Sequence, residues 1–126
     1  MKILNVIETA YRATIEEQDD PAVWITHAMK GAGGDLSVLL RGNAVNYAVK
    51  GQDGSGLSFG SWHQVHPAAL DKDIESLIQK GVTVYVVEDD VAERGLERHQ
   101  LCQGVEGVSK KRIHALFDAH DAVWHW

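Results

Sequence analysis

Short apolar runs alternate along the chain with segments of helical periodicity. Three runs have the length of a strand: Ile3–Ile7, Leu36–Leu40 and Val82–Val87. Continuous apolar runs of this length are typical of strands that are buried on both faces of a parallel sheet. Every position of Val82–Val87 is occupied by a residue that favours a strand. We therefore expect Val82–Val87 to lie inside the sheet rather than at its edge.

Helical patterns separate these runs. One begins at Pro21, which suits a first helical turn, and either Asp19 or Asp20 is placed to cap it. A second begins at Pro67, and its apolar face consists of Leu70, Ile74, Leu77 and Ile78. Weaker signals predict three further elements: a short helix at Ala44–Val49, a small strand or loop at Gly104–Val108 and a final strand at Ala122–Trp126. The pattern assigns no structure to Glu8–Asp20 or Leu57–His66.

This alternation of strands and helices predicts an α/β fold. We expect one domain over residues 1–126, with a mostly parallel sheet of about five strands between two layers of helices. Folds of this class bind ligands at the carboxyl ends of their strands. The predicted pocket therefore lies near the ends of the first and third strands and is lined by Tyr11, Arg12, Asn43, Val87, Asp89 and Asp90.

Composition narrows the range of functions. The chain has 126 residues, and its 12 basic and 18 acidic side chains give a net charge of −6. This acidic balance argues against a nucleic-acid binder. The apolar runs are far shorter than the roughly 20 residues that span a bilayer, and the N-terminal sequence does not resemble a signal peptide. With a single cysteine, these features lead us to expect a soluble, cytoplasmic protein without a membrane partner.

Glycine-rich segments and histidines predict no cofactor and no metal site. Gly31–Gly34 and Gly51–Gly56 each follow a helix, whereas a phosphate-binding loop lies between a strand and a helix. His63 and His66 are three residues apart, but no carboxylate or thiol near them in the sequence completes a metal site. The remaining pair, His120 and His125, flanks the last strand and is interpreted as surface or interface.

Two further features have both a chemical and a structural interpretation. The acidic run Glu88–Asp90 directly follows a strand, where a carboxylate is either catalytic or simply solvated and capping the next helix. We favour the structural interpretation. Cys102 is the one thiol, and Arg98 and His99 are close enough in sequence to lower its pKa. An inert, space-filling cysteine is the more common case.

Several stretches of the sequence resemble the DsrE/DsrF-like family, small α/β proteins of intracellular sulfur relay. The stretches are Leu39–Val45, Lys50–Gln52, Gly81–Val87, Arg94–Leu96 and Leu101–Glu106. The last of these is similar to the family's Leu-x-x-Gly-Val-Glu. The resemblance extends from Ile3 to Trp126 and is weakest over Glu8–Asp20. It implies a flavodoxin-like, three-layer α/β/α domain that assembles into oligomers.

The resemblance also implies where the family's chemistry would lie. Relay members carry a persulfide on a cysteine at the end of the third main strand, a position occupied here by Val87. A second cysteine of some members falls on Asp90. The catalytic thiol is therefore not carried over, and we expect a divergent, non-catalytic binding or assembly subunit. Two alternatives stay open: a persulfide carrier that uses Cys102, and a small hydrolase or metal enzyme that uses Asp89, Asp90 and a histidine.

Tryptophans predict self-association. Trp62, Trp124 and Trp126 are large aromatic residues at loop and terminal positions, and such residues are enriched at interfaces. They could instead cover the domain's own core. Together with the family resemblance, they lead us to expect a homo-oligomer, a trimer or a hexamer, with a protein of sulfur relay as a further partner.

Overall fold

The main sheet consists of five parallel strands. The structure is a computed structural model and describes residues 1–12 and 19–126. In sheet order the strands are β6 (Glu106–Val108), β5 (Thr83–Val87), β2 (Asp35–Leu40), β1 (Lys2–Ile7) and β7 (Ala122–His125). Each neighbouring pair runs parallel. The predicted α/β class and five-stranded sheet are confirmed.

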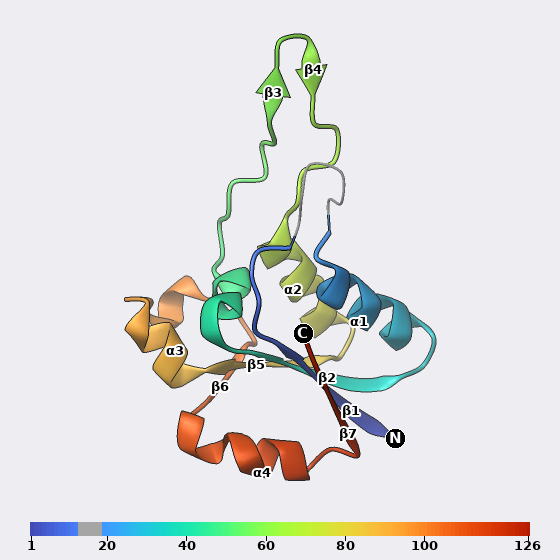
Figure 1. Cartoon of the computed structure of the whole chain (residues 1–126), viewed down its shortest axis with the longest axis vertical. Helices are drawn as coiled ribbons and strands as arrows, with labels where there is room; N and C mark the ends of the chain where they lie inside the picture. The colour runs from blue at the N-terminus through green and yellow to red at the C-terminus, as the bar shows by residue number, and fades with distance from the viewer. Residues whose placement is uncertain (13–18) are drawn as a thin grey trace.

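Helices cover both faces of this sheet, which makes three layers (Figure 1). One face packs against four elements: α1 (Pro21–Gly31), η1 (Gly42–Ala48), α2 (Leu70–Gln79) and α3 (Glu88–Glu93). The other face packs against α4 (Ile113–Asp118). Two short 3-10 turns, η2 (Arg98–Gln100) and η3 (Lys110–Arg112), join the later elements. This is the layered, flavodoxin-like arrangement that the resemblance implies.

Strand β5 lies in the interior of the sheet, between β2 and β6, as its sequence predicts. Val84 and Val86 point into the larger core, beneath the four elements of the first face. Tyr85 and Val87 point to the opposite side, into the smaller core beneath α4. The continuous apolar run is explained by this burial on both faces, because successive side chains of a strand point to opposite sides.

Helix α1 is capped by Asp20, which decides between the two aspartates. Its Oδ1 accepts hydrogen bonds from the backbone N–H groups of Ala22 (2.8 Å) and Val23 (3.1 Å). Its Oδ2 accepts a third from the hydroxyl of Tyr47 at 2.6 Å. The side chain is completely buried. One carboxylate therefore satisfies the first turn of α1 and joins that helix to η1.

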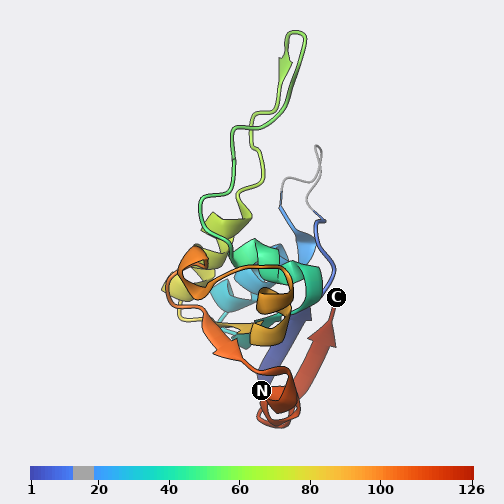
Figure 2. The same ribbon diagram turned by 90° about the vertical axis from the view of Figure 1, so that its left-hand side faces the viewer.

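The segment before α2 differs from the prediction. The helix begins at Leu70 rather than at Pro67, because Ala69 has an extended φ of −133° and the apolar face begins only at Leu70. The segment Leu57–His66, to which the pattern assigned no structure, forms an antiparallel hairpin of β3 (Ser58–Phe59) and β4 (Trp62–His63). Figure 2 shows this hairpin at the tip of a long projection from the body.

Other elements match the sequence pattern more closely. The short helix expected at Ala44–Val49 is η1, and the small strand near Gly104–Val108 is β6. Within the unassigned segment Glu8–Asp20, residues 13–18 lie outside the described part of the chain. Among the described residues, no helix has the length and apolar character needed to cross a bilayer.

Candidate functional site

The carboxyl ends of the strands meet at one edge of the sheet, where the sequence predicts the pocket. The strand order separates the two strands named for that pocket: β2 lies between β1 and β5. Arg41, directly after β2, therefore stands between the end of β1 and the end of β5, and its backbone N–H donates to Ile7 O at 3.0 Å. The predicted residues spread along this edge rather than facing each other across one gap.

The last residue of the chain closes part of this edge beside β1. The backbone N–H of Trp126 donates to Val6 O at 2.9 Å, and its carbonyl accepts from the N–H of Glu8 at 3.0 Å. Its indole N–H donates to the buried side chain of Asn5. Next to it, Glu8 Oε2 and His125 Nε2 are 2.7 Å apart. His125 is thus a surface residue, and its contact with Glu8 joins the end of β7 to the end of β1.

Tyr11 and Arg12 form the first group of predicted site residues. The ring centroids of Tyr11 and Tyr47 are 5.3 Å apart, and the backbone N–H of Arg12 donates to the Tyr47 hydroxyl at 3.2 Å. Burial raises the pKa of Tyr11. The pKa of Tyr47 is raised further, by burial first and then by the carboxylate of Asp20. Both hydroxyls are therefore neutral near pH 7, and Tyr47 acts as a structural hydrogen-bond donor.

Asn43 and Asp90 form the second group. Asn43 Oδ1 accepts two hydrogen bonds from Arg94, at 3.1 Å from Nε and 2.8 Å from Nη2. Asp90 Oδ2 accepts from the backbone N–H of Gly42 at 2.7 Å. These contacts tie η1 to α3. The structure thus brings Asn43 and Asp90 into one region, where they join two elements.

Val87 and Asp89 lie on the α4 side of this edge. Val87 is 1% exposed and packs in the smaller core with Leu39 and Ile113. Asp89 Oδ1 accepts from the backbone N–H of Lys110 at 2.7 Å. The run Glu88–Asp90 forms the first turn of α3, where negative side chains are favoured by the helix dipole. These contacts support the structural interpretation of the acidic run.

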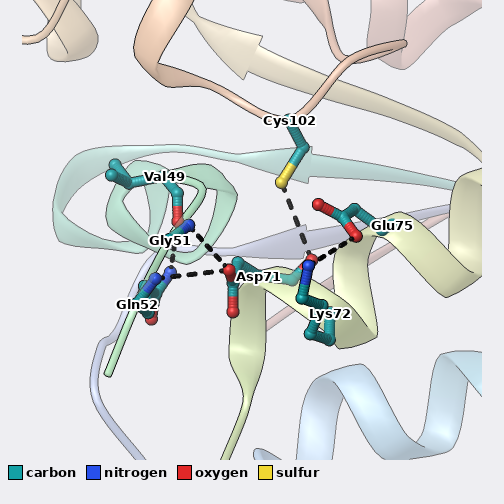
Figure 3. Close-up of polar contacts among 7 residues, drawn as sticks. All are labelled: Val49, Gly51, Gln52, Asp71, Lys72, Glu75 and Cys102. Atoms are coloured by element: carbon teal, nitrogen blue, oxygen red, sulfur yellow. Dashed lines mark hydrogen bonds and ion pairs between the residues drawn. The ribbon is translucent and has the colours of Figure 1, made fainter. Parts of the chain in front are cut away.

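Cys102 lies apart from this edge, where three segments meet (Figure 3). Its backbone N–H donates to Ala48 O at 2.7 Å, which fixes it beside the end of η1. Its thiol points toward the first turn of α2 and donates to the carbonyl of Asp71 at 3.6 Å. The residue is 3% exposed. The sulfur is therefore enclosed by the fold.

The surroundings of Cys102 keep the thiol protonated. Burial is the largest cause, and the negative charges of Glu75 and Asp71 add to it, so the pKa rises from 9.0 to about 11. Lys72 opposes this shift only in part, because its ammonium pairs with Glu75 at 3.3 Å. A reactive cysteine requires the opposite environment, an exposed thiol whose anion is stabilised by nearby positive charge.

Arg98 and His99 do not supply that positive charge, which the sequence offered as the less favoured of two interpretations of Cys102. A guanidinium N–H of Arg98 donates to the carbonyl of Val105. His99 is exposed, and its Nδ1 lies 3.1 Å from the carboxylate of Glu97. Spacing along the chain misled here because Cys102 follows the turn η2 in an extended segment, so neighbours in sequence are not neighbours in space.

The histidines of the described residues make separate contacts. His63 lies on the hairpin, where its Nδ1 is 2.7 Å from the hydroxyl of Ser58. His120 Nδ1 is 2.8 Å from the carbonyl of Leu116. Over residues 1–12 and 19–126, no three His, Cys, Asp or Glu side chains are grouped so that they could hold a metal ion.

The sequence did not predict one polar cluster, which His27, Asp73 and Lys80 form between α1 and α2. His27 Nε2 is 3.1 Å from the carbonyl of Asp73, and its Nδ1 is 3.0 Å from Lys80 Nζ. Burial, followed by repulsion from Asp19 and Asp71, raises the pKa of Asp73 to about 6. Because these residues come from separate helices, no local spacing in the sequence signals the cluster.

A second feature missed from the sequence is the clamp around Asp71. Its buried carboxylate accepts from the backbone N–H groups of Gly51 at 2.9 Å and Gln52 at 3.3 Å (Figure 3). The side-chain amide of Gln52 donates to three carbonyls, those of Asn46, Tyr47 and Val49. The clamp fixes the point where the chain leaves η1 for the projecting hairpin.

Comparison with solved structures identifies the architecture. The ychN protein from E. coli superposes with a TM-score of 0.72 at 19% sequence identity, over 99% of this chain and 98% of that chain. The chain has the fold of ychN. The protein of unknown function BT1422 from Bacteroides thetaiotaomicron superposes with a TM-score of 0.68 at 12% identity, over 99% and 94% of the two chains.

A third solved structure shares the same fold. The protein of unknown function MTH1491 from Methanobacterium thermoautotrophicum superposes with a TM-score of 0.58 at 12% identity, over 98% of this chain and 96% of that chain. No family model matches the sequence. No curated protein matches it either. At these identities the similarity to ychN and the two other structures concerns the fold.

Proposed function

We propose that this chain is a divergent DsrE/DsrF-like protein that acts near intracellular sulfur metabolism as a non-catalytic binding or assembly subunit. The DsrE/DsrF-like stretches of the sequence and the fold shared with ychN support the placement. The burial of the chain's one thiol supports the non-catalytic role. Sulfur relay requires a thiolate that attacks the outer sulfur of a donor persulfide and releases the donor thiol.

Neither candidate position meets this requirement. The strand-end position of the family is Val87, which has no nucleophilic atom and is 1% exposed. Cys102 has the nucleophilic atom, but it is 3% exposed and its pKa is raised to about 11. The burial of Cys102 is the observation that carries the proposal, because a relay through this residue requires the sulfur to reach a partner's persulfide.

The proposal predicts that the folded chain accepts no sulfur. After incubation with a small-molecule persulfide at neutral pH, the intact mass of the native chain is expected to stay unchanged. Cys102→Ser provides the matched control, because it removes the one thiol. A gain of one sulfur atom that appears in the native chain and disappears in Cys102→Ser would establish the alternative, a persulfide carrier that uses Cys102.

An assembly subunit must also associate, and we propose a homo-oligomer, a trimer or a hexamer. Trp126 is 37% exposed, and Trp62, on the hairpin, is 44% exposed. Sedimentation velocity at micromolar concentration is expected to give a species heavier than one 13.9 kDa chain. Cys102→Ser is expected to sediment in the same way, because assembly does not depend on the thiol. Sedimentation as a single chain would refute the assembly role.

A further inference from the structure

The feature that the proposed function does not yet use is the projecting arm, residues 53–67. Figures 1 and 2 show that it rises away from the body and returns, with β3 and β4 at its tip. Among residues 1–12 and 19–126, its hydrogen bonds stay within the arm: Leu57 with Gln64 and Ser58 with His63, in addition to the strand pairing. Neither core cluster of the described residues includes an arm residue. The described part of the body therefore leaves the arm outside its core.

The arm is apolar where it is most exposed. Its large apolar side chains are all accessible: Leu57 (48%), Phe59 (61%), Trp62 (44%) and Val65 (77%). Phe59 and Trp62 stack with their ring centroids 5.8 Å apart. A two-stranded hairpin is marginally stable by itself in water, and large exposed apolar surfaces mark interaction sites. The arm has the properties of a surface that is covered by another molecule.

The base of the arm is fixed. Asp71 and Gln52 hold the chain at Gly51 through buried or half-buried hydrogen bonds. On the return side, Pro67 leads within three residues into α2, whose Leu70 is buried in the larger core. A fixed base limits the region that the aromatic tip can reach, which lowers the entropy cost of docking.

The body carries an apolar groove of about 520 Å³, and no residue of the arm is among those that line it. It lies between α1 and β7 and is lined by Ile25, Met29, Trp124, His125 and Trp126. Strand β7 is an edge strand, so its outer backbone groups are available for pairing. The groove is therefore apolar and lies next to an open sheet edge. The apolar surface could cover the aromatic side chains of a hairpin, and the open edge could pair with its backbone.

We propose that the arm of one copy lies in the groove between α1 and β7 of a second copy. Charge favours this occupant: the chain carries −6, whereas the arm contains one carboxylate, Asp53, and neither lysine nor arginine. It is thus a segment that approaches an acidic copy without strong repulsion. Aromatic side chains have roughly 150–250 Å² to bury, and Phe59 and Trp62 still expose 61% and 44% of their surfaces. Together with the exposed parts of Leu57 and Val65, this accessible area is a substantial part of the about 800 Å² per partner of a standard interface.

Arm and groove are different surfaces, so the contact is head-to-tail. A head-to-tail contact forms a closed ring when its rotation closes. The inference rests on the proposed assembly role and deepens it, because it names the interface of the trimer or of each ring of a hexamer.

Site-specific cross-linking tests the contact directly. Ser61→Cys lies at the arm tip and Met29→Cys lies in the groove, each made in a Cys102→Ala background. When the two chains are mixed and treated with a short bis-maleimide, a covalent product containing one copy of each is expected. Lys111→Cys, beside α4, replaces Met29→Cys as the matched control and is expected to give no product. Cross-linking of Ser61→Cys to itself alone would indicate arm–arm pairing and overturn the proposal.

Removal of the aromatic tip separates this inference from the assembly role itself. Phe59→Ser/Trp62→Ser is expected to weaken association at least about 100-fold, as for loss of two interface hot spots, with an unchanged far-UV circular dichroism spectrum. Trp24→Ser, an exposed tryptophan outside the groove lining, is expected to keep the parent's association. If the parent assembles and the double variant assembles equally well, the arm contact is wrong and the assembly role stands. If the parent itself is monomeric, both are wrong.

Discussion

Replacement of Asp20 with alanine is expected to lower the free energy of unfolding by about 3 kcal/mol, from the loss of a helix cap and of a hydrogen bond to a buried charge. The carboxylate accepts from two N–H groups of α1 and from the hydroxyl of Tyr47. Its loss leaves the first turn of α1 uncapped and the buried hydroxyl without its acceptor. Urea unfolding at neutral pH, followed by circular dichroism, measures the change.

Two controls identify the source of this effect. Asp19→Ala, the neighbouring carboxylate that the sequence pattern ranks equally, is expected to change the stability by less than about 0.5 kcal/mol. Tyr47→Phe combined with Asp20→Ala is expected to cost less than the sum of the two single changes, because the orphaned hydroxyl is gone. Equal losses for Asp19→Ala and Asp20→Ala would contradict the assigned cap.

The sequence predicts the sheet well because the evidence for each strand is local. All six residues of Val82–Val87 favour a strand, and this local pattern predicts both the strand and its position inside the sheet. Pro21 similarly marks the start of α1. The cap of that helix is less predictable, because the sequence pattern allows either Asp19 or Asp20. In the fold, Asp20 accepts from two N–H groups of α1 and from the hydroxyl of Tyr47, which lies 27 residues later.

The arm could not be predicted from the pattern. Leu57–His66 mixes apolar and polar residues over strands of only two residues each, which is too short for a periodicity to appear. Its aromatic residues, Phe59 and Trp62, belong to neither core cluster of the described residues. A pattern that reflects burial in the chain's own core carries no signal for residues that such a core does not cover.

The candidate site was predicted in part. The strand-end residues lie along the expected edge, but the order β5-β2-β1 separates Tyr11 and Arg12 from Asp89 and Asp90. The environment of Cys102 depends on α2, whose Asp71 lies 31 residues away. Its raised pKa is therefore a property of the tertiary fold, whereas the sequence suggested the nearby cations Arg98 and His99.

Cys102 is expected to react with iodoacetamide at least about 100-fold more slowly in the folded chain than an unperturbed thiol at the same pH. A pKa raised from 9.0 to about 11 reduces the thiolate at neutral pH about tenfold per unit, and burial restricts access further. The sign for stability follows from the same shift. The protonated thiol's contribution to stability is present below about pH 9 and is lost as the pH rises through about 11.

The most direct test is the rate at which iodoacetamide labels Cys102 at pH 7.5, measured by intact mass in the folded chain and in urea. It tests whether the fold keeps the one thiol buried and protonated, and therefore unreactive. Cys102→Ala provides the blank, and Asp20→Ala is expected to raise the native rate because it raises the population of opened chains. The account predicts a native rate at least about 100-fold below the rate in urea. Equal rates in the two conditions would contradict it, since they would mean that the thiol is open and ionisable in the native fold.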